Sequence, residues 1–135
     1  MQPIFVDVAH TTQLETVIAE VARMRADALI VRADPLFTSN RDRIASLALK
    51  HALPTMAEGK PFVSAGCLAS YAPKYSTISR SMAIIVDKVL KGAKPGDIPI
   101  EQPTQFELVI NLKTAKALGI IVPQALLLRA DEVVS

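Results

Sequence analysis

The run Ala28-Leu-Ile-Val31 constrains the fold most, because all four residues are apolar and a strand there would be buried on both faces. Such strands occur in parallel sheets that helices cover on both sides. A helix precedes the run, since apolar residues recur at the spacing of one helical face. These residues are Leu14, Val17, Ile18, Val21 and Ala22. We therefore expect an α/β fold with a mainly parallel sheet and helices on both faces.

The same alternation continues along the chain. Thr12 and Glu15 have capping-box spacing for the first helix, and Ser39 or Asn40 is expected to cap a second helix that ends near His51. The longest helix is predicted from Ile78 to Val89 and is closed by Lys91-Gly92. Strands are predicted at 4–8, 28–33, 54–57, 67–71 and 106–112, single helical turns at 62–65 and from 123, a proline-rich linker at 93–103 and a short helix at 113–118.

Composition excludes several classes of protein. The net charge is only +2, and Lys and Arg are dispersed among acidic residues, so no nucleic-acid-binding surface is predicted. Cys67 is the single cysteine and allows no internal disulfide. No continuous apolar segment is long enough to span a membrane, and the N-terminus lacks a signal-peptide pattern. His10 and His51 lie in separate segments, so no metal site is predicted.

Three polar side chains are placed at the expected carboxyl ends of strands. Asp34 follows the strand of residues 28–33, Glu58 follows the next strand, and Tyr71 ends the third. In open α/β sheets, ligands bind outside the carboxyl ends of the strands. A carboxylate there can accept hydrogen bonds from an amine or a hydroxyl group. The alternative for Asp34 is an ordinary Asp-Pro turn, which needs no ligand.

Phe37 and Phe62 are two further candidates, because a ring near this edge could stack on a ring-bearing ligand. Their alternative is a purely structural role in an aliphatic core. The sequence contains no nucleophile–base pair, no Gly-x-Ser-x-Gly turn and no Gly-rich phosphate loop. We therefore expect no catalysis and no cofactor.

The run from Glu101 to Gly119 resembles the closing segment of the substrate-binding proteins of bacterial ABC importers, in particular those of the tryptophan and aromatic-amino-acid type. Four more blocks agree with that family in order and spacing, so the resemblance covers nearly the whole chain. They are residues 25–37, 43–48, 86–95 and 127–134.

This resemblance implies a type I solute-binding fold with two lobes, of which the chain matches the C-terminal part. Residues 1–58 would belong to the C-terminal lobe, 59–100 would pack on the N-terminal lobe, and 101–135 would supply the return strand and the C-terminal helix. The family captures a small solute such as an amino acid and delivers it to an ABC permease. The resemblance also implies a periplasmic or lipid-anchored location, and ligand contacts at Asp34, Phe37, Glu58, Phe62 and Tyr71.

The segment from Ala65 to Ala72 departs from the family pattern. The family more often has Gly-Gly-Leu-Met-Ser-Tyr-Gly there, whereas this chain has Gly66-Cys-Leu-Ala-Ser-Tyr-Ala72. Two glycines and a methionine are replaced. Because this loop would face the cleft, the identity of the ligand cannot be taken from the family.

Two alternatives come from other functional classes. Asp34 and Lys60-Pro61 resemble parts of a phosphoacceptor receiver domain, but Val8-Ala-His10 stands where that family has paired acidic residues. An effector-binding domain of a transcription regulator would share the type I fold, although no helix-turn-helix is found. We also expect the chain to form a homodimer, because an incomplete lobe would leave strand edges and apolar faces uncovered.

Overall fold

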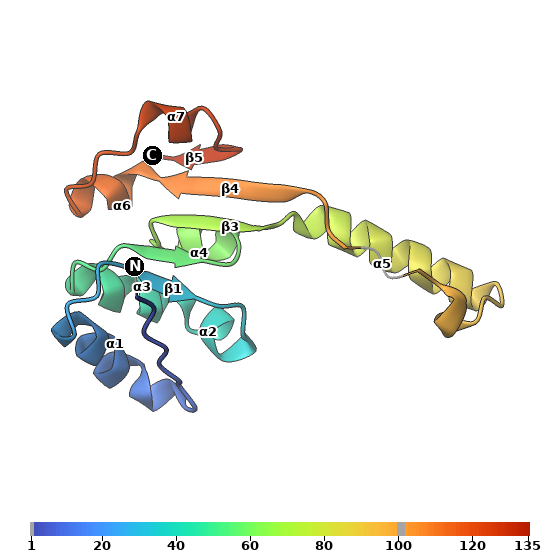
Figure 1. Cartoon of the computed structure of the whole chain (residues 1–135), viewed down its shortest axis with the longest axis horizontal. Helices are drawn as coiled ribbons and strands as arrows, with labels where there is room; N and C mark the ends of the chain where they lie inside the picture. The colour runs from blue at the N-terminus through green and yellow to red at the C-terminus, as the bar shows by residue number, and fades with distance from the viewer. Residues whose placement is uncertain (1, 100–101) are drawn as a thin grey trace. The chain divides into compact units, whose positions relative to one another are not determined.

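A computed structural model describes residues 2–99 and 102–135 (Figure 1). Helices and strands alternate along most of the chain, as the sequence predicts. The helices are α1 (Leu14–Arg23), α2 (Pro35–Ser39), α3 (Arg41–Lys50), α4 (Lys60–Ser64), α5 (Tyr75–Leu90), α6 (Leu112–Ala117) and α7 (Gln124–Leu127). The strands are β1 (Leu29–Val31), β2 (Thr55–Ala57), β3 (Ala69–Pro73), β4 (Phe106–Asn111) and β5 (Glu132–Val134). Within the described ranges, every helix is too short or too polar to cross a bilayer.

The strands form one mostly parallel sheet in the order β1-β2-β3-β4-β5. β1 pairs with β2, β2 with β3, and β4 with β5, all in parallel. Two hydrogen bonds flank β3 and β4, from Asn111 N to Leu68 O (2.8 Å) and from Lys74 N to Gln105 O (3.0 Å). Their residue numbers run in opposite directions, so β4 is antiparallel to β3. The predicted α/β fold with a mainly parallel sheet is confirmed.

One face of the sheet carries the core. Val31 and Ala57, neighbours in register, are almost fully buried beneath side chains of α1, α3 and α4. The apolar stripe of α1 packs there through Leu14, Ile18 and Val21. On the opposite face, Ile30 is 68% exposed and its neighbour Met56 is 37% exposed.

Helix ends differ in detail from the predicted caps. The expected capping box of Thr12 and Glu15 does not form, and Gln13 accepts bonds from the amides of Ala9 and His10 instead, at 3.0 Å each. Asn40 precedes α3 but its side chain caps nothing there, because its amide donates to Leu36 O at 2.7 Å. The predicted closure of the longest helix at Gly92 is confirmed, and the short helix predicted at 113–118 is likewise followed by a glycine, Gly119; both glycines have positive φ.

The predicted strand at residues 4–8 is wrong. Ile4 and Phe5 are 58% and 90% exposed, and within the described residues no backbone hydrogen bond joins residues 4–8 to a strand. A β-branched segment forms a stable strand only when a neighbouring strand forms backbone hydrogen bonds with it. Conversely, β5 and the short helix α2 were not predicted. β5 depends on pairing with Val109–Asn111, far away in sequence.

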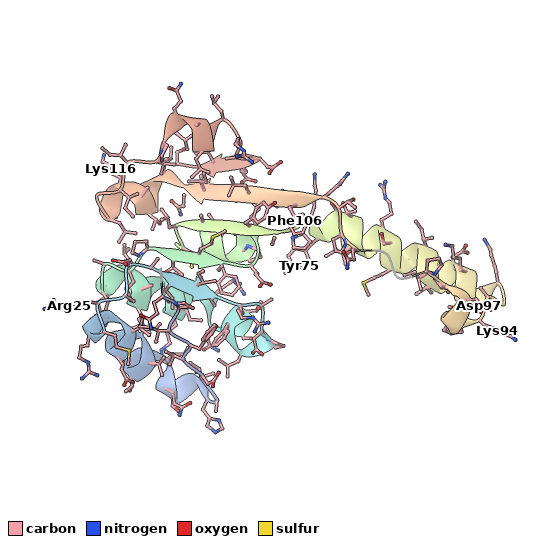
Figure 2. The ribbon with its side chains drawn as sticks, viewed as in Figure 1. Arg25, Tyr75, Lys94, Asp97, Phe106 and Lys116 are labelled. Carbon is pink, nitrogen blue, oxygen red and sulfur yellow. The ribbon has the colours of Figure 1, made fainter. Side chains whose placement is uncertain are left out.

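The chain divides into two compact units. The first comprises residues 1–71 and 108–135, and the second comprises residues 72–107. In the second unit, α5 contains no buried residue, and many of its apolar side chains are exposed. Figure 2 shows Tyr75 and Phe106 at one end of this unit and Lys94 and Asp97 at the other. Thr77 Oγ1 bonds to Gln105 Oε1 at 2.9 Å inside the unit.

Candidate ligand-binding edge of the sheet

The candidate site lies where the parallel strands β1, β2 and β3 end. In register, Val31 is beside Ala57, and Ala57 is beside Ser70. The residues that follow directly are Arg32, just after β1, Glu58, just after β2, and Tyr71 in β3, and continuing the register by one residue places them in a row at the same edge. All three are exposed. The register thus brings together two residues predicted from sequence, Glu58 and Tyr71, and adds Arg32, which the sequence analysis missed.

Tyr71 is placed by strict alternation along β3. Its neighbours Ser70 and Ala72 are 1% and 6% exposed, whereas Tyr71 is 52% exposed. Successive side chains of a strand point to opposite faces of the sheet. Tyr71 therefore shares a face with Ala69, and through the register with Ile30 and Met56.

Asp34 lies just beyond this row and begins α2. Its Oδ1 accepts the Leu36 amide at 2.8 Å, and its carbonyl accepts the Thr38 amide at 2.9 Å. Pro35 takes the first helical position, where no amide hydrogen is needed. The turn role that the Asp-Pro pair predicts is therefore present. No described residue bonds to Oδ2, and the side chain is exposed, so one carboxylate oxygen remains available to a ligand.

The loop after β2 is shaped by Gly59 and held by one ion pair. Gly59 is buried with φ of 111°, a conformation that L side chains rarely adopt, and it turns the chain from Glu58 into α4. Lys60 Nζ then contacts Glu132 Oε2 at 2.6 Å, which links the start of α4 to the start of β5. Both side chains are partly exposed, so the pair orients the loop more than it stabilises the fold.

The two predicted phenylalanines lie in the core. Phe62 is only 2% exposed and belongs to the core cluster with Ile44 and Cys67. Phe37 is partly buried and packs against the same cluster. Their packing matches the structural alternative given above, so the candidate edge consists of Arg32, Asp34, Glu58 and Tyr71.

An open depression of about 430 Å³ lies between the starts of α3 and α4. Arg41, Asp42, Lys60, Pro61, Ser64 and Ala65 line it. Its lining residues differ from the row at the ends of β1 to β3. It is also open to solvent, whereas a small-molecule site buries most of its ligand.

Nothing in the described part of the chain suggests bond-making chemistry. No group of three His, Cys, Asp or Glu residues there could hold a metal ion. Burial raises the pKa of the Cys67 thiol to about 11. A thiol with that pKa is almost entirely protonated near neutral pH, and a protonated thiol is a poor nucleophile. Cys67 is therefore a core residue rather than a nucleophile.

Comparisons with known proteins identify the family. A family model described as "ABC transporter substrate binding protein" matches residues 4–134. The chain belongs to this family, as the resemblance in its sequence predicts. Members are substrate-binding components rather than enzymes and are typically extracytoplasmic.

A curated relative and three solved structures resemble this chain over part of their length. A tyrosine-binding protein of Clostridioides difficile (strain R20291) is 31% identical over 94 residues, which cover 70% of this chain and 27% of that protein. The ABC domain from Streptococcus pneumonia, solved in complex with L-Trp, is 28% identical to this chain with a TM-score of 0.85. The match covers 94% of this chain and 44% of that structure's chain.

Two further structures share the fold. A conserved domain protein from Vibrio cholerae is 24% identical with a TM-score of 0.87, over 95% of this chain and 43% of its own. A ligand-free, open substrate-binding protein from Clostridium difficile is 20% identical with a TM-score of 0.69, and the match covers 98% of this chain and 44% of that protein's chain. The chain thus spans less than half the length of each of these four proteins.

Proposed function

We propose that this chain forms the C-terminal part of a two-lobed ABC importer protein that captures an amino acid with an aromatic side chain. The observation that carries the proposal is the row of polar and aromatic side chains at one edge of a parallel sheet, in a chain of this family. The names of two relatives support the ligand class, since one is a tyrosine-binding protein and another was solved with L-Trp.

Each residue of the edge has a distinct role in the proposal. The free oxygen of Asp34 accepts a hydrogen bond from the ammonium group of the solute, and the Glu58 carboxylate adds a second negative charge. Tyr71 presents an exposed ring on which an aromatic solute can stack. Phe37 and Phe62 support the edge from the core instead of touching the solute.

The lobe boundaries in this proposal follow the compact units of the structure. Residues 1–71 and 108–135 form the C-terminal lobe, and residues 72–107 belong to the N-terminal lobe. The sequence alone suggested changes of lobe near residues 59 and 100. We move them to the unit boundaries because α4 and the first half of β3 belong to the first unit.

In the complete protein, the second lobe would close over the edge and exclude water from the solute. Closure would be a population shift driven by tighter binding to the closed form. The closed protein would dock on its permease from the periplasm or from a lipid anchor at the cell envelope. It would catalyse no reaction.

The proposal predicts that Asp34→Asn weakens amino-acid binding without unfolding the protein. Asn caps helices about as well as Asp, so the free energy of unfolding should stay within about 0.5 kcal/mol of wild type. Loss of the charge should weaken L-tryptophan or L-tyrosine binding about tenfold or more. Calorimetric titration of the intact protein measures the affinity, and thermal unfolding checks stability.

Asp27→Asn is the matched control for this experiment. Asp27 is an exposed carboxylate just before β1, so it loses the same charge at the opposite end of the same strand. The Asp34 assignment is wrong if the two variants bind the amino acids equally well.

A further inference from the structure

We propose that Arg32 binds the carboxylate of the solute and that Arg32 and Glu58 together recognise its zwitterionic backbone. This inference rests on the proposed function and names the part of the edge that distinguishes amino acids from amines. It starts from the row of Arg32, Glu58 and Tyr71 defined by the strand register.

The register places opposite charges side by side. Val31 and Ala57 are the last paired residues of adjacent parallel strands, and Arg32 and Glu58 are the residues that follow them directly. Neighbouring strands lie about 4.8 Å apart. Two long side chains that leave the sheet at that spacing can both reach one small molecule, one from the positive side and one from the negative side.

Both charged groups are available for a ligand. Arg32 and Glu58 are exposed, and among residues 2–99 and 102–135 neither side chain takes part in an ion pair or side-chain hydrogen bond. This contrasts with Lys60 and Glu132, which pair at 2.6 Å on the next part of the same edge.

The chemistry of the row matches an aromatic amino acid group by group. A guanidinium presents a planar fork of N–H donors that fits a carboxylate through two parallel hydrogen bonds. A neighbouring carboxylate accepts from the ammonium group. Tyr71, third in the row, offers a ring on the far side of Glu58. An amine without a carboxylate would leave Arg32 unpaired in the closed site, so the row should bind amines more weakly than amino acids.

The test compares L-tryptophan with two analogues, each of which lacks one of its two charged groups. L-tryptophan carries both groups, tryptamine lacks the carboxylate, and indole-3-propionate lacks the ammonium group. In the intact protein, Arg32→Gln should weaken binding of L-tryptophan and indole-3-propionate about tenfold or more and should not weaken binding of tryptamine. Arg32→Lys should recover part of the loss, since it restores the charge but not the fork.

Arg25→Gln is the control variant. Arg25 precedes β1, and Figure 2 places it with Lys116 at the edge where β1 begins and β4 ends. The inference is overturned if wild type binds L-tryptophan and Arg32→Gln behaves like Arg25→Gln. Tryptamine binding that is as tight in Arg32→Gln as in wild type, or tighter, shows that the site is intact, and a parallel loss for all three ligands would assign Arg32 a structural role instead. If wild type binds neither L-tryptophan nor L-tyrosine, the proposed function itself fails.

Discussion

Cys67 is a buried residue whose pKa is shifted by its environment. It is 1% exposed, contributes to the core, and has a pKa raised from 9.0 to about 11 by desolvation. Because the folded state disfavours the thiolate, the thiol contributes its full stability below pH 9 and loses it as the pH rises towards 11.

We predict that native Cys67 resists alkylation by iodoacetamide. At pH 8 its thiolate fraction should be about one hundredth of that in the unfolded chain, and burial slows access further. Labelling of the 135-residue chain should therefore be at least about 100-fold slower in buffer than in concentrated urea. Comparable rates in the two solvents would show that Cys67 is not buried as described.

At the residue scale, the sequence predicted which residues lie at the ends of strands better than it separated ligand contacts from core positions. Asp34, Glu58 and Tyr71 could be placed at one edge because apolar runs predict where strands end. Phe62 could not be placed, since a Phe in a helical turn after a strand can face either the solvent or the core. Arg32 was missed because its place next to Glu58 follows only from the register between strands, in which the preceding residues Val31 and Ala57 are paired.

At the scale of elements, the junction of β4 and α6 depends on Asn111. This residue is 6% exposed, its Nδ2 donates to Val63 O at 3.1 Å, and its Oδ1 accepts the Thr114 amide at 3.0 Å as the helix cap. Thr114 Oγ1 adds a bond to Gly66 O at 2.9 Å. Together these bonds attach the start of α6 to the end of α4.

Asn111→Ala should destabilise the protein by about 1–3 kcal/mol. The change removes a helix cap, worth about 1 kcal/mol, and a buried side-chain hydrogen bond to Val63 O, worth about 0.5–1.5 kcal/mol, while Val63 O keeps the Gly66 amide at 3.0 Å. Urea unfolding measures the loss. Asn40→Ala removes a side-chain bond in a less buried turn and serves as the control; similar midpoints for the two variants would contradict the role of Asn111.

The elements that the sequence missed are those that local pattern does not determine. Residues 4–8 have the composition of a strand, yet no described strand pairs with them. β5 is only three residues long and forms through contacts with β4, where Asp131 Oδ2 accepts the Leu108 amide at 2.8 Å. Both outcomes depend on partners distant in sequence, which periodicity does not reveal.

At the scale of the whole molecule, the chain exposes several large apolar side chains. α5 exposes Met82, Val86 and Leu90 at 61%, 55% and 82%, and Ile30 lies open on the sheet face of the first unit. Patches of this kind are covered by other protein surface in stable molecules. The homodimer expected from the sequence stays a prediction, and in the two-lobed protein the remainder of the polypeptide would cover the same residues.

The central claim, that the edge of Arg32, Asp34, Glu58 and Tyr71 binds an amino acid, is tested most directly by amide chemical-shift mapping. The ¹⁵N-labelled intact protein is titrated with L-tryptophan and, separately, with L-tyrosine. We predict that shift changes within residues 1–71 and 108–135 concentrate at Arg32–Leu36, Glu58–Lys60 and Ser70–Tyr71. The opposite end of the sheet, including Arg25 and Lys116, should change little. Saturable changes centred on that opposite end, or none with either amino acid, would contradict the account.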